Sequence, residues 1–264
     1  MRSTILEYDI AKITELARQG KRLDGRAVDQ MRDFSIEVNK YQNAEGSARI
    51  LLGQTEVVAG IKMAVDKPYP DSPDEGAISV GAELIPLAHA DYESGPPSLE
   101  EIEIARVVDR GIRESKSLDF AKLCIKEGEA CWIAFMDFYA INSDGNLFDA
   151  GSLAGLAAFL NAKFPKLDAN NKIIKHEYGN NLTLVRLPIL TTFVKVGGTI
   201  MVDPTYLEEK AAEGRYSVAT TEDGYMSAMQ KGPGIFTADE INAMIELAFR
   251  VGADARKKLL KMAK

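Results

Sequence analysis

The sequence predicts an α+β protein made of two halves with similar architecture. Each half has several strand patterns in succession, followed by one or two helices that close over a sheet. The halves share this order of elements but not their residues, which indicates a pseudo-duplication. No Gly-x-Gly-x-x-Gly follows a predicted strand and no Walker loop is present, so a Rossmann or P-loop fold is excluded.

The first half begins with a helix and continues with strands. Apolar residues recur at helical spacing through the first twenty residues, and Gly20 follows as a C-terminal stop. Residues 53–55 predict a hairpin turn, and residues 65–76 predict a loop because three prolines gather there. Alternating or apolar runs predict strands over residues 34–38, 48–52, 56–63 and 77–87.

The clearest helix signal begins at Ser98. Ser98 and Glu101 form a capping box, and further acids load the first turn, where the helix dipole favours them. The helix is expected to run to about Ser115 or Ser117. Strands over 124–126 and 131–142 follow, and then a tightly packed helix over 150–162, rich in Ala, Gly and Leu.

The polar stretch 168–181 begins the second half. It predicts either a domain junction or a hairpin that decorates one. A final helix is expected after Thr237, capped with Glu240. Strands are predicted over 182–190, 192–196, 199–202, 217–221 and 226–231. The predicted organisation is an N-terminal helical segment (1–21), a first unit (22–167) and a second unit (168–264).

Composition sets limits on the class of protein. The chain has 264 residues, of which 46% are hydrophobic and 27% charged, as in ordinary globular proteins. The formal charge is −7, so contact with nucleic acid requires a local basic patch or a partner that supplies charge. The apolar stretch 152–160 is too short to span a bilayer, and residues 1–10 contain Glu7 and Asp9. We therefore expect no membrane association and no secretory signal.

Cysteine and histidine are scarce. Cys124 and Cys131 fit no zinc motif and are too few for a disulfide framework, so two buried, reduced thiols are expected. His89 and His176 lie far apart in the sequence. A histidine metal site or a Ser/His/Asp arrangement is therefore poorly supplied, and we predict no metal site.

Several local motifs coincide along nearly the whole chain. They include RLDGR at 22–26, IARVVDRGIRES at 104–115, DGNLFDA at 144–150 and VDPT at 202–205. Together they resemble the RNase PH family, and within it the non-catalytic RNase PH-like subunit of the archaeal exosome. The resemblance implies a fold of two βαβα units, of the ribosomal protein S5 domain 2-like type.

The resemblance also implies partners and an activity. It implies a six-membered ring in which this chain alternates with a catalytic RNase PH-like subunit as a trimer of dimers. A cap of S1-domain RNA-binding subunits and a single-stranded RNA substrate complete the implied complex. The implied ring degrades RNA from its 3′ end with inorganic phosphate, in the cytoplasm. The phosphate and any divalent metal would belong to the partner's site, and this chain would bind no cofactor of its own.

Three departures from the family pattern predict that the chain has no catalytic residues. Catalytic members have a tandem arginine before the first long helix, but residues 94–98 here read SGPPS. Their Gly-rich phosphate loop is replaced by 146–152, in which Asp149 is expected to put negative charge where an anion would sit. Two family aspartates match Glu209 and Arg215, and a cation cannot act as a general acid. Asp203 and Glu208 are expected to cap or charge a helix turn.

The long helix carries Arg106, Arg110 and Arg113 at i, i+4 and i+7, which places them on one face. Guanidinium groups bind phosphate bidentately. From the residues alone, ion pairs with Glu103, Asp109 and Glu114 on a solvated face are an alternative interpretation that stays open. The resemblance favours RNA contact, because related subunits use arginines of this helix at the shared active site. The opposite face, with Ile102, Ala105, Val108 and Ile112, suits packing on a sheet.

Two alternative functions agree less well with the sequence. A self-sufficient phosphorolytic RNase of the RNase PH type is disfavoured by the three departures above. A small-molecule kinase with the same half-fold would need a Gly/Ser-rich phosphate loop that opens a helix, and the sequence has none.

Overall fold

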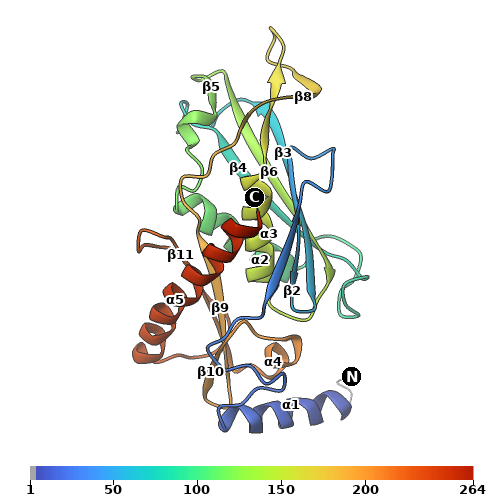
Figure 1. Ribbon diagram of the computed structural model, residues 1–264, viewed down its shortest axis with the longest axis vertical. Helices are drawn as coiled ribbons and strands as arrows, with labels where there is room; N and C mark the ends of the chain where they lie inside the picture. Colours follow the sequence, from blue (N-terminus) through green and yellow to red (C-terminus); the bar gives the residue numbers. More distant parts are fainter. Residues whose placement is uncertain (1–3, 264) are drawn as a thin grey trace.

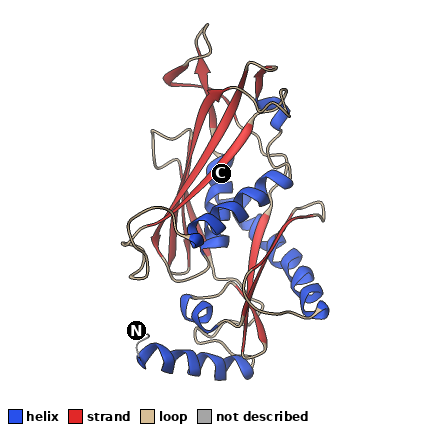
Figure 2. Cartoon of the chain, turned by 180° about the vertical axis from the view of Figure 1, so that it is seen from behind, coloured by secondary structure: helices blue, strands red, loops and turns tan. Residues whose placement is uncertain are grey.

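The computed structural model describes residues 4–263 and has two main β-sheets with helices packed against them, together with a small two-stranded sheet (Figures 1 and 2). The larger sheet has six strands in the order β1-β2-β3-β6-β4, with β5 paired to the start of β6. Only the β4–β6 pair is parallel. The strands are β1 (Phe34–Val38), β2 (Gly46–Leu52), β3 (Thr55–Asp66), β4 (Ala77–Leu84), β5 (Cys124–Lys126) and β6 (Ala130–Asn142).

The smaller sheet has four antiparallel strands in the order β10-β9-β11-β12. One face packs on α5 through an apolar cluster that includes Phe193 and Met244. The other face packs on α1 through a cluster that includes Ile13 and Val194. The elements are β9 (Ile189–Val196), β10 (Thr199–Val202), β11 (Gly214–Thr220), β12 (Met226–Lys231), α1 (Thr4–Arg18), α4 (Tyr206–Ala211) and α5 (Ala238–Met262).

Helix α3 (Leu147–Leu160) lies between the two sheets and contacts β2, β3 and β9. Every residue from Leu147 to Phe159 is buried, as expected for a helix that is apolar all round. The helix begins three residues before the predicted start at 150, because Asn146 adopts a left-handed conformation and its side chain accepts a hydrogen bond from the Asp149 amide.

The long helix, α2 (Leu99–Glu114), confirms the strongest sequence signal. Ser98 is the N-cap, and its capping box with Glu101 is complete. The helix covers β4 and also touches β12 of the smaller sheet. A short 3₁₀ turn, η1 (Phe120–Leu123), leads from it into β5.

The polar stretch after α3 forms a hairpin of β7 (Lys163–Leu167) and β8 (Ile173–Asn181), which projects at the top of Figure 1. The hairpin alternative is therefore confirmed. The predicted strand over 182–190 is wrong, because Ile189 is the first residue of β9. Pro188 has no N–H to donate to a sheet, and the apolar side chains of Leu182 and Leu187 are buried from a loop instead.

Both thiols are free. Cys131 is buried as predicted, and burial raises the pKa of its thiol. Cys124, which pairs with Cys131 across the β5–β6 ladder, is only partly buried. Among the helices of residues 4–263, none has the length and apolar character needed to cross a bilayer.

Close packing of α3 on the larger sheet depends on Gly46. A Cβ at this position would collide with the carbonyl oxygen of Ala158 and lie 2.7 Å from the Cα atom of Ala162. We predict that Gly46→Ala lowers the free energy of unfolding by about 2 kcal/mol or more, since backbone must move. Gly60, in the adjacent strand, is the matched control, because its Cβ would meet Ala44 at an ordinary 3.7 Å. Urea denaturation that gave equal losses for both variants would contradict this account.

Candidate functional site

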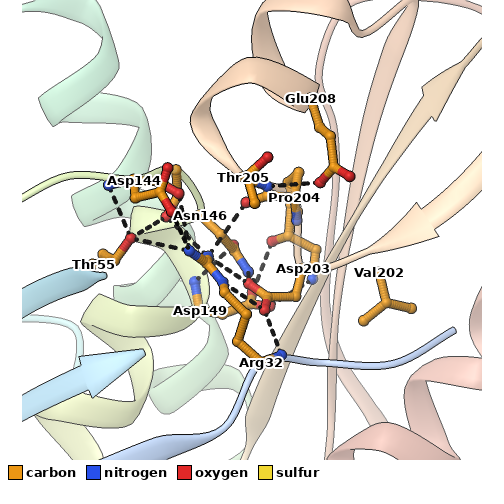
Figure 3. Close-up of polar contacts among 12 residues, drawn as sticks. Arg32, Thr55, Asp144, Asn146, Asp149, Val202, Asp203, Pro204, Thr205 and Glu208 are labelled. Carbon is orange, nitrogen blue, oxygen red and sulfur yellow. Dashed lines mark hydrogen bonds and ion pairs between the residues drawn. The ribbon is translucent and has the colours of Figure 1, made fainter. Parts of the chain in front are cut away.

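The junction between the two sheets is organised around one buried carboxylate, that of Asp203 (Figure 3). Arg32 contacts it with a two-pronged guanidinium, Nε to Oδ2 at 2.9 Å and Nη2 to Oδ1 at 2.8 Å. The Arg32 amide adds a third hydrogen bond, at 2.8 Å to Oδ2. Burial alone would raise the pKa of Asp203, but the hydrogen bonds and charge of Arg32 outweigh it and hold that pKa below its ordinary value.

Asn146 connects this carboxylate to the start of α3. Its side-chain amide donates to Asp203 at 2.6 Å and to Asp149 at 2.8 Å. Asp149 also accepts hydrogen bonds from the amide and the hydroxyl of Thr192 on β9. Burial raises the pKa of Asp149 to about 7, an effect that the Asn146 bond opposes and the charge of Asp203 reinforces.

The N-terminal loop forms a second buried contact, with helix α4. Arg22 donates to both oxygens of Glu208, from Nε at 2.8 Å and from Nη2 at 2.5 Å. Glu208 also caps α4, since its carboxylate accepts a hydrogen bond from the Thr205 amide. The expectation that Glu208 caps a helix turn is confirmed. Asp203, by contrast, caps no helix and is the counter-ion of Arg32.

A cavity of about 230 Å³ lies beside this junction. The first turns of α2 and α3, helix α4 and strands β9 and β11 form its wall. Acidic, basic and aromatic side chains all face it: Glu100, Glu209, Lys210, Arg215, Tyr92, Phe148 and Tyr206. Asp91 also lines the cavity. Its carboxylate accepts a hydrogen bond from the Tyr206 hydroxyl and forms an ion pair with Lys210, both at 2.8 Å.

Glu209 closes the N-terminus of α3 on the side of this cavity. Its Oε1 accepts a hydrogen bond from the Asn146 backbone N–H at 2.9 Å. Burial raises the pKa of Glu209 to about 7, the hydrogen bond from Asn146 opposes the rise, and Glu100 reinforces it. A carboxyl group of the protein therefore occupies a place where a helix N-terminus would otherwise attract an external anion.

The expectation for Asp149 is corrected by this arrangement. The sequence predicts that Asp149 puts negative charge at the anion position, but its side chain is completely buried and points to Thr192. Glu209 has that position instead. A sequence pattern identifies an acid in the first turn of a helix but not the direction in which its side chain leaves the helix.

Arg215 lies in the cavity wall at the position that matches a family aspartate. Its guanidinium stacks on the Phe148 ring, 4.2 Å from the centroid, and Nη2 contacts the Glu103 carboxylate at 2.5 Å. A guanidinium remains protonated at any physiological pH. This position therefore offers neither a general acid nor an oxygen ligand for a metal.

The three predicted RNA-contact residues lie along α2 in different settings. Arg106 is exposed and forms no salt bridge with any side chain of residues 4–263. Arg110 is partly buried and donates to the side chain of Gln230 on β12 at 3.3 Å. Arg113 pairs with Asp109 at 2.6 Å. The ion-pair interpretation therefore describes Arg113, and Arg106 has no such partner, because Glu103 turns to Arg215.

The packing face of α2 differs from the predicted one at Ile102. That side chain is 43% exposed, and the helix is buried instead through a wider strip that includes Ile104, Val107 and Gly111. Ala105, Val108 and Ile112 are buried as predicted.

Within residues 4–263, no group of three or more histidine, cysteine or acidic side chains is arranged to hold a metal ion.

Both halves of the chain match models of one protein family. Residues 30–165 match the family model described as 3′ exoribonuclease family, domain 1, and residues 186–251 match domain 2 of the same family. The chain therefore belongs to the RNase PH family of 3′ exoribonucleases. The predicted resemblance and the expected fold of two RNase PH-like βαβα units are confirmed. The predicted boundary between 167 and 168 stays a prediction.

Proteins named exosome complex component Rrp42 are among the relatives of this chain. The chain is 44% identical to exosome complex component Rrp42 of Thermococcus kodakarensis, over 94% of this chain and 93% of the relative. It is 45% identical to Rrp42 of Methanocella arvoryzae, over 94% of each. The solved structure of the Archaeoglobus fulgidus exosome with RNA bound to the active site contains a chain that superposes with a TM-score of 0.90, at 39% identity, over 97% of this chain and 99% of that one.

Sequence reasoning missed the residues that build the junction. Arg32, Asn146 and Thr192 are single polar residues in no recognised pattern, although Asn146 falls within the DGNLFDA motif. The one usable signal is positional, since Asn146 follows a glycine just before a helix and is a favoured N-cap residue.

Glu209 makes the stability of the protein depend on pH with a defined sign. An acid whose pKa rises from 4.5 to about 7 on folding holds its proton more tightly in the folded state. Stability therefore falls as the pH rises through this window. From about pH 5.5 to about pH 8, Glu209 is expected to contribute a loss of about 2 kcal/mol. Glu209→Gln should remove this pH-dependent loss, because the Gln amide does not titrate. The Gln carbonyl oxygen can still accept the hydrogen bond from the Asn146 amide, so the local geometry is retained.

The measurement is chemical denaturation of both proteins at the two pH values. Asp149 contributes in the same direction in both, so the difference between the two slopes isolates Glu209. Glu213→Gln, at an exposed acid nearby, is the control and should keep the wild-type slope. A Glu209→Gln protein with the full wild-type loss would contradict the assignment.

Proposed function

We propose that this chain is the non-catalytic, structural and RNA-binding subunit of an archaeal exosome. It would complete a hexameric phosphorolytic 3′-to-5′ exoribonuclease ring with a catalytic RNase PH-like partner. The proposal is supported by identities of 41–45% to archaeal Rrp42 chains that match this one over almost its full length. It is also supported by the superposition on a chain of an exosome structure with bound RNA.

The observation that carries the non-catalytic part is the hydrogen bond from the Asn146 amide to Glu209. Phosphorolysis needs an inorganic phosphate held by positive charge and N–H groups, and an acid that serves the leaving oxygen. In this chain a carboxyl group faces the helix N-terminus, and a guanidinium fills the place of an acid. The segment before α2, residues 94–98, contains no arginine.

The proposed partners follow from the same reasoning. The catalytic subunit would hold the phosphate and any divalent metal, and this chain would bind neither. S1-domain cap subunits and single-stranded RNA complete the complex. With a net charge of −7, this chain needs a local basic surface to approach RNA. The proposed location of the complex is the cytoplasm.

The arginines of α2 are the proposed basic surface. Arg106, Arg110 and Arg113 would contact RNA phosphates next to the partner's active site and so help to shape it. Arg106 supports this proposal most directly, because it is exposed and has no ion-pair partner among residues 4–263. Arg110 is held at its side-chain end by Gln230, which reduces the entropy that a phosphate contact would cost.

The first test is a phosphorolysis assay on a 3′-extended RNA. We expect no phosphate-dependent release of nucleoside diphosphates by this chain alone. When the chain is co-expressed with a catalytic RNase PH-like partner, we expect activity together with the mass of a hexamer. Release of nucleoside diphosphates by the isolated chain would contradict the proposal, because the chain would then contain a working site.

The second test replaces Arg106 and Arg110 by glutamate in the assembled ring. RNA affinity, measured without phosphate, should fall by about tenfold or more. The slope of log Kd against log salt should fall by about 0.7 for each phosphate of the single-stranded RNA that the ring no longer neutralises. A double variant of exposed arginines elsewhere, Arg18→Glu with Arg250→Glu, has the same change in net charge and should bind RNA like the wild type. Equal weakening in both double variants would show a nonspecific charge effect and contradict the proposed surface.

A further inference from the structure

Arg215 is connected to the arginines of α2 by a chain of polar contacts. Its Nη2 donates to Oε1 of Glu103 at 2.5 Å. The same Glu103 oxygen accepts from the side-chain amide of Gln230 at 3.2 Å. The Gln230 carbonyl oxygen in turn accepts from Nη1 of Arg110 at 3.3 Å. The contacts run from the wall of the cavity to the surface proposed to bind RNA.

We infer that Arg215 is a positioning residue for this RNA-contact surface, and the inference rests on the function proposed above. Arg215 holds the carboxylate of Glu103 away from Arg106 and, through Gln230, fixes the orientation of Arg110. The ligand it serves is the phosphate backbone of single-stranded RNA. Arg215 itself touches no RNA.

The effect on Arg106 follows from the spacing along the helix. Glu103 lies three residues before Arg106, a separation at which opposite charges on a helix pair readily. In the structure Glu103 pairs with Arg215 instead, and Arg106 has no salt bridge with residues 4–263. Without the guanidinium of Arg215, Glu103 would be left with uncompensated charge and would turn to Arg106.

The effect on Arg110 follows from the polarity of Gln230. A side-chain amide has a donor end and an acceptor end. Because Glu103 accepts from the donor end, the carbonyl oxygen faces Arg110. A Gln230 released from Glu103 would be able to rotate and present its NH₂ group to Arg110, which has no acceptor to offer.

The packing of Arg215 explains how it holds this geometry. The guanidinium is stacked on Phe148, and its side chain is 18% exposed. It is therefore held by a ring of α3, a helix that is buried on all sides. Phe148 fixes Arg215, and Arg215 fixes Glu103.

The test measures RNA affinity of the ring assembled with its catalytic partner, in phosphate-free buffer. Arg215→Gln should weaken binding by about fivefold to tenfold, which corresponds to about one ordinary hydrogen bond. It should also lower the salt slope by about 0.7, because Arg106 becomes paired with Glu103 and no longer neutralises an RNA phosphate. Arg215→Lys retains the charge beside Glu103 and should retain most of the affinity.

The decisive variant is the double substitution Glu103→Gln with Arg215→Gln. Removal of the Glu103 charge leaves nothing to capture Arg106, so the double variant should recover most of the affinity and the salt slope that Arg215→Gln removes. A purely structural role for Arg215 predicts no recovery. An unchanged affinity in Arg215→Gln, or a double variant as weak as the single one, would overturn the inference.

A second variant covers the case in which Arg215→Gln does not assemble, as judged by the mass of the complex. Gln230→Leu removes the link to Arg110 without touching Arg215 or the cavity, and should weaken RNA binding. Affinity equal to the wild type would then overturn the inference. The Arg106→Glu, Arg110→Glu variant distinguishes a failure of the proposed RNA-binding surface from a failure of the role of Arg215. If this variant binds RNA normally, the proposed surface is wrong. If this variant binds weakly while the Arg215 and Gln230 variants bind normally, only the role of Arg215 is wrong.

Discussion

The carboxylate of Asp203 is the fixed point on which the rest of the junction depends. It lies at the end of β10, completely buried, and accepts hydrogen bonds from Arg32 in the N-terminal loop and Asn146 at the start of α3. A charge so deeply buried is tolerable only because a guanidinium faces it with matching geometry. That requirement fixes the relative positions of the N-terminal loop, the end of β10 and the start of α3. The shape of the neighbouring cavity depends on these positions.

In the cavity, groups that would suit an external anion are paired with other groups of the protein. The N–H groups at the start of α3 face Glu209 and the side chain of Asn146, and the cation at position 215 is neutralised by Glu103. The Asn146 and Asp149 N–H groups and the Nη2 end of Arg215, which a ligand would otherwise contact, therefore have partners within the protein. Arg106, which lies about two turns into α2, has no ion-pair partner within residues 4–263.

The elements with local signals were predictable from the sequence, and those decided by distant contacts were not. The capping boxes at Ser98 and Thr237 place α2 and α5 correctly, since a cap is a property of four neighbouring residues. The strand expected over 182–190 fails because an apolar run can be buried from a loop as well as from a sheet. The ion pair of Arg32 joins residues 171 positions apart, and no local pattern announces it.

Helix α3 has a consequence for how the molecule folds and evolves. Because all of its faces are covered, by the larger sheet on one side and β9 on the other, neither half retains a complete core without it. The two halves are therefore not independently folding domains, and neither can be removed or exchanged alone. They are expected to melt in a single cooperative transition, and a substitution in this helix is constrained by two sheets at once.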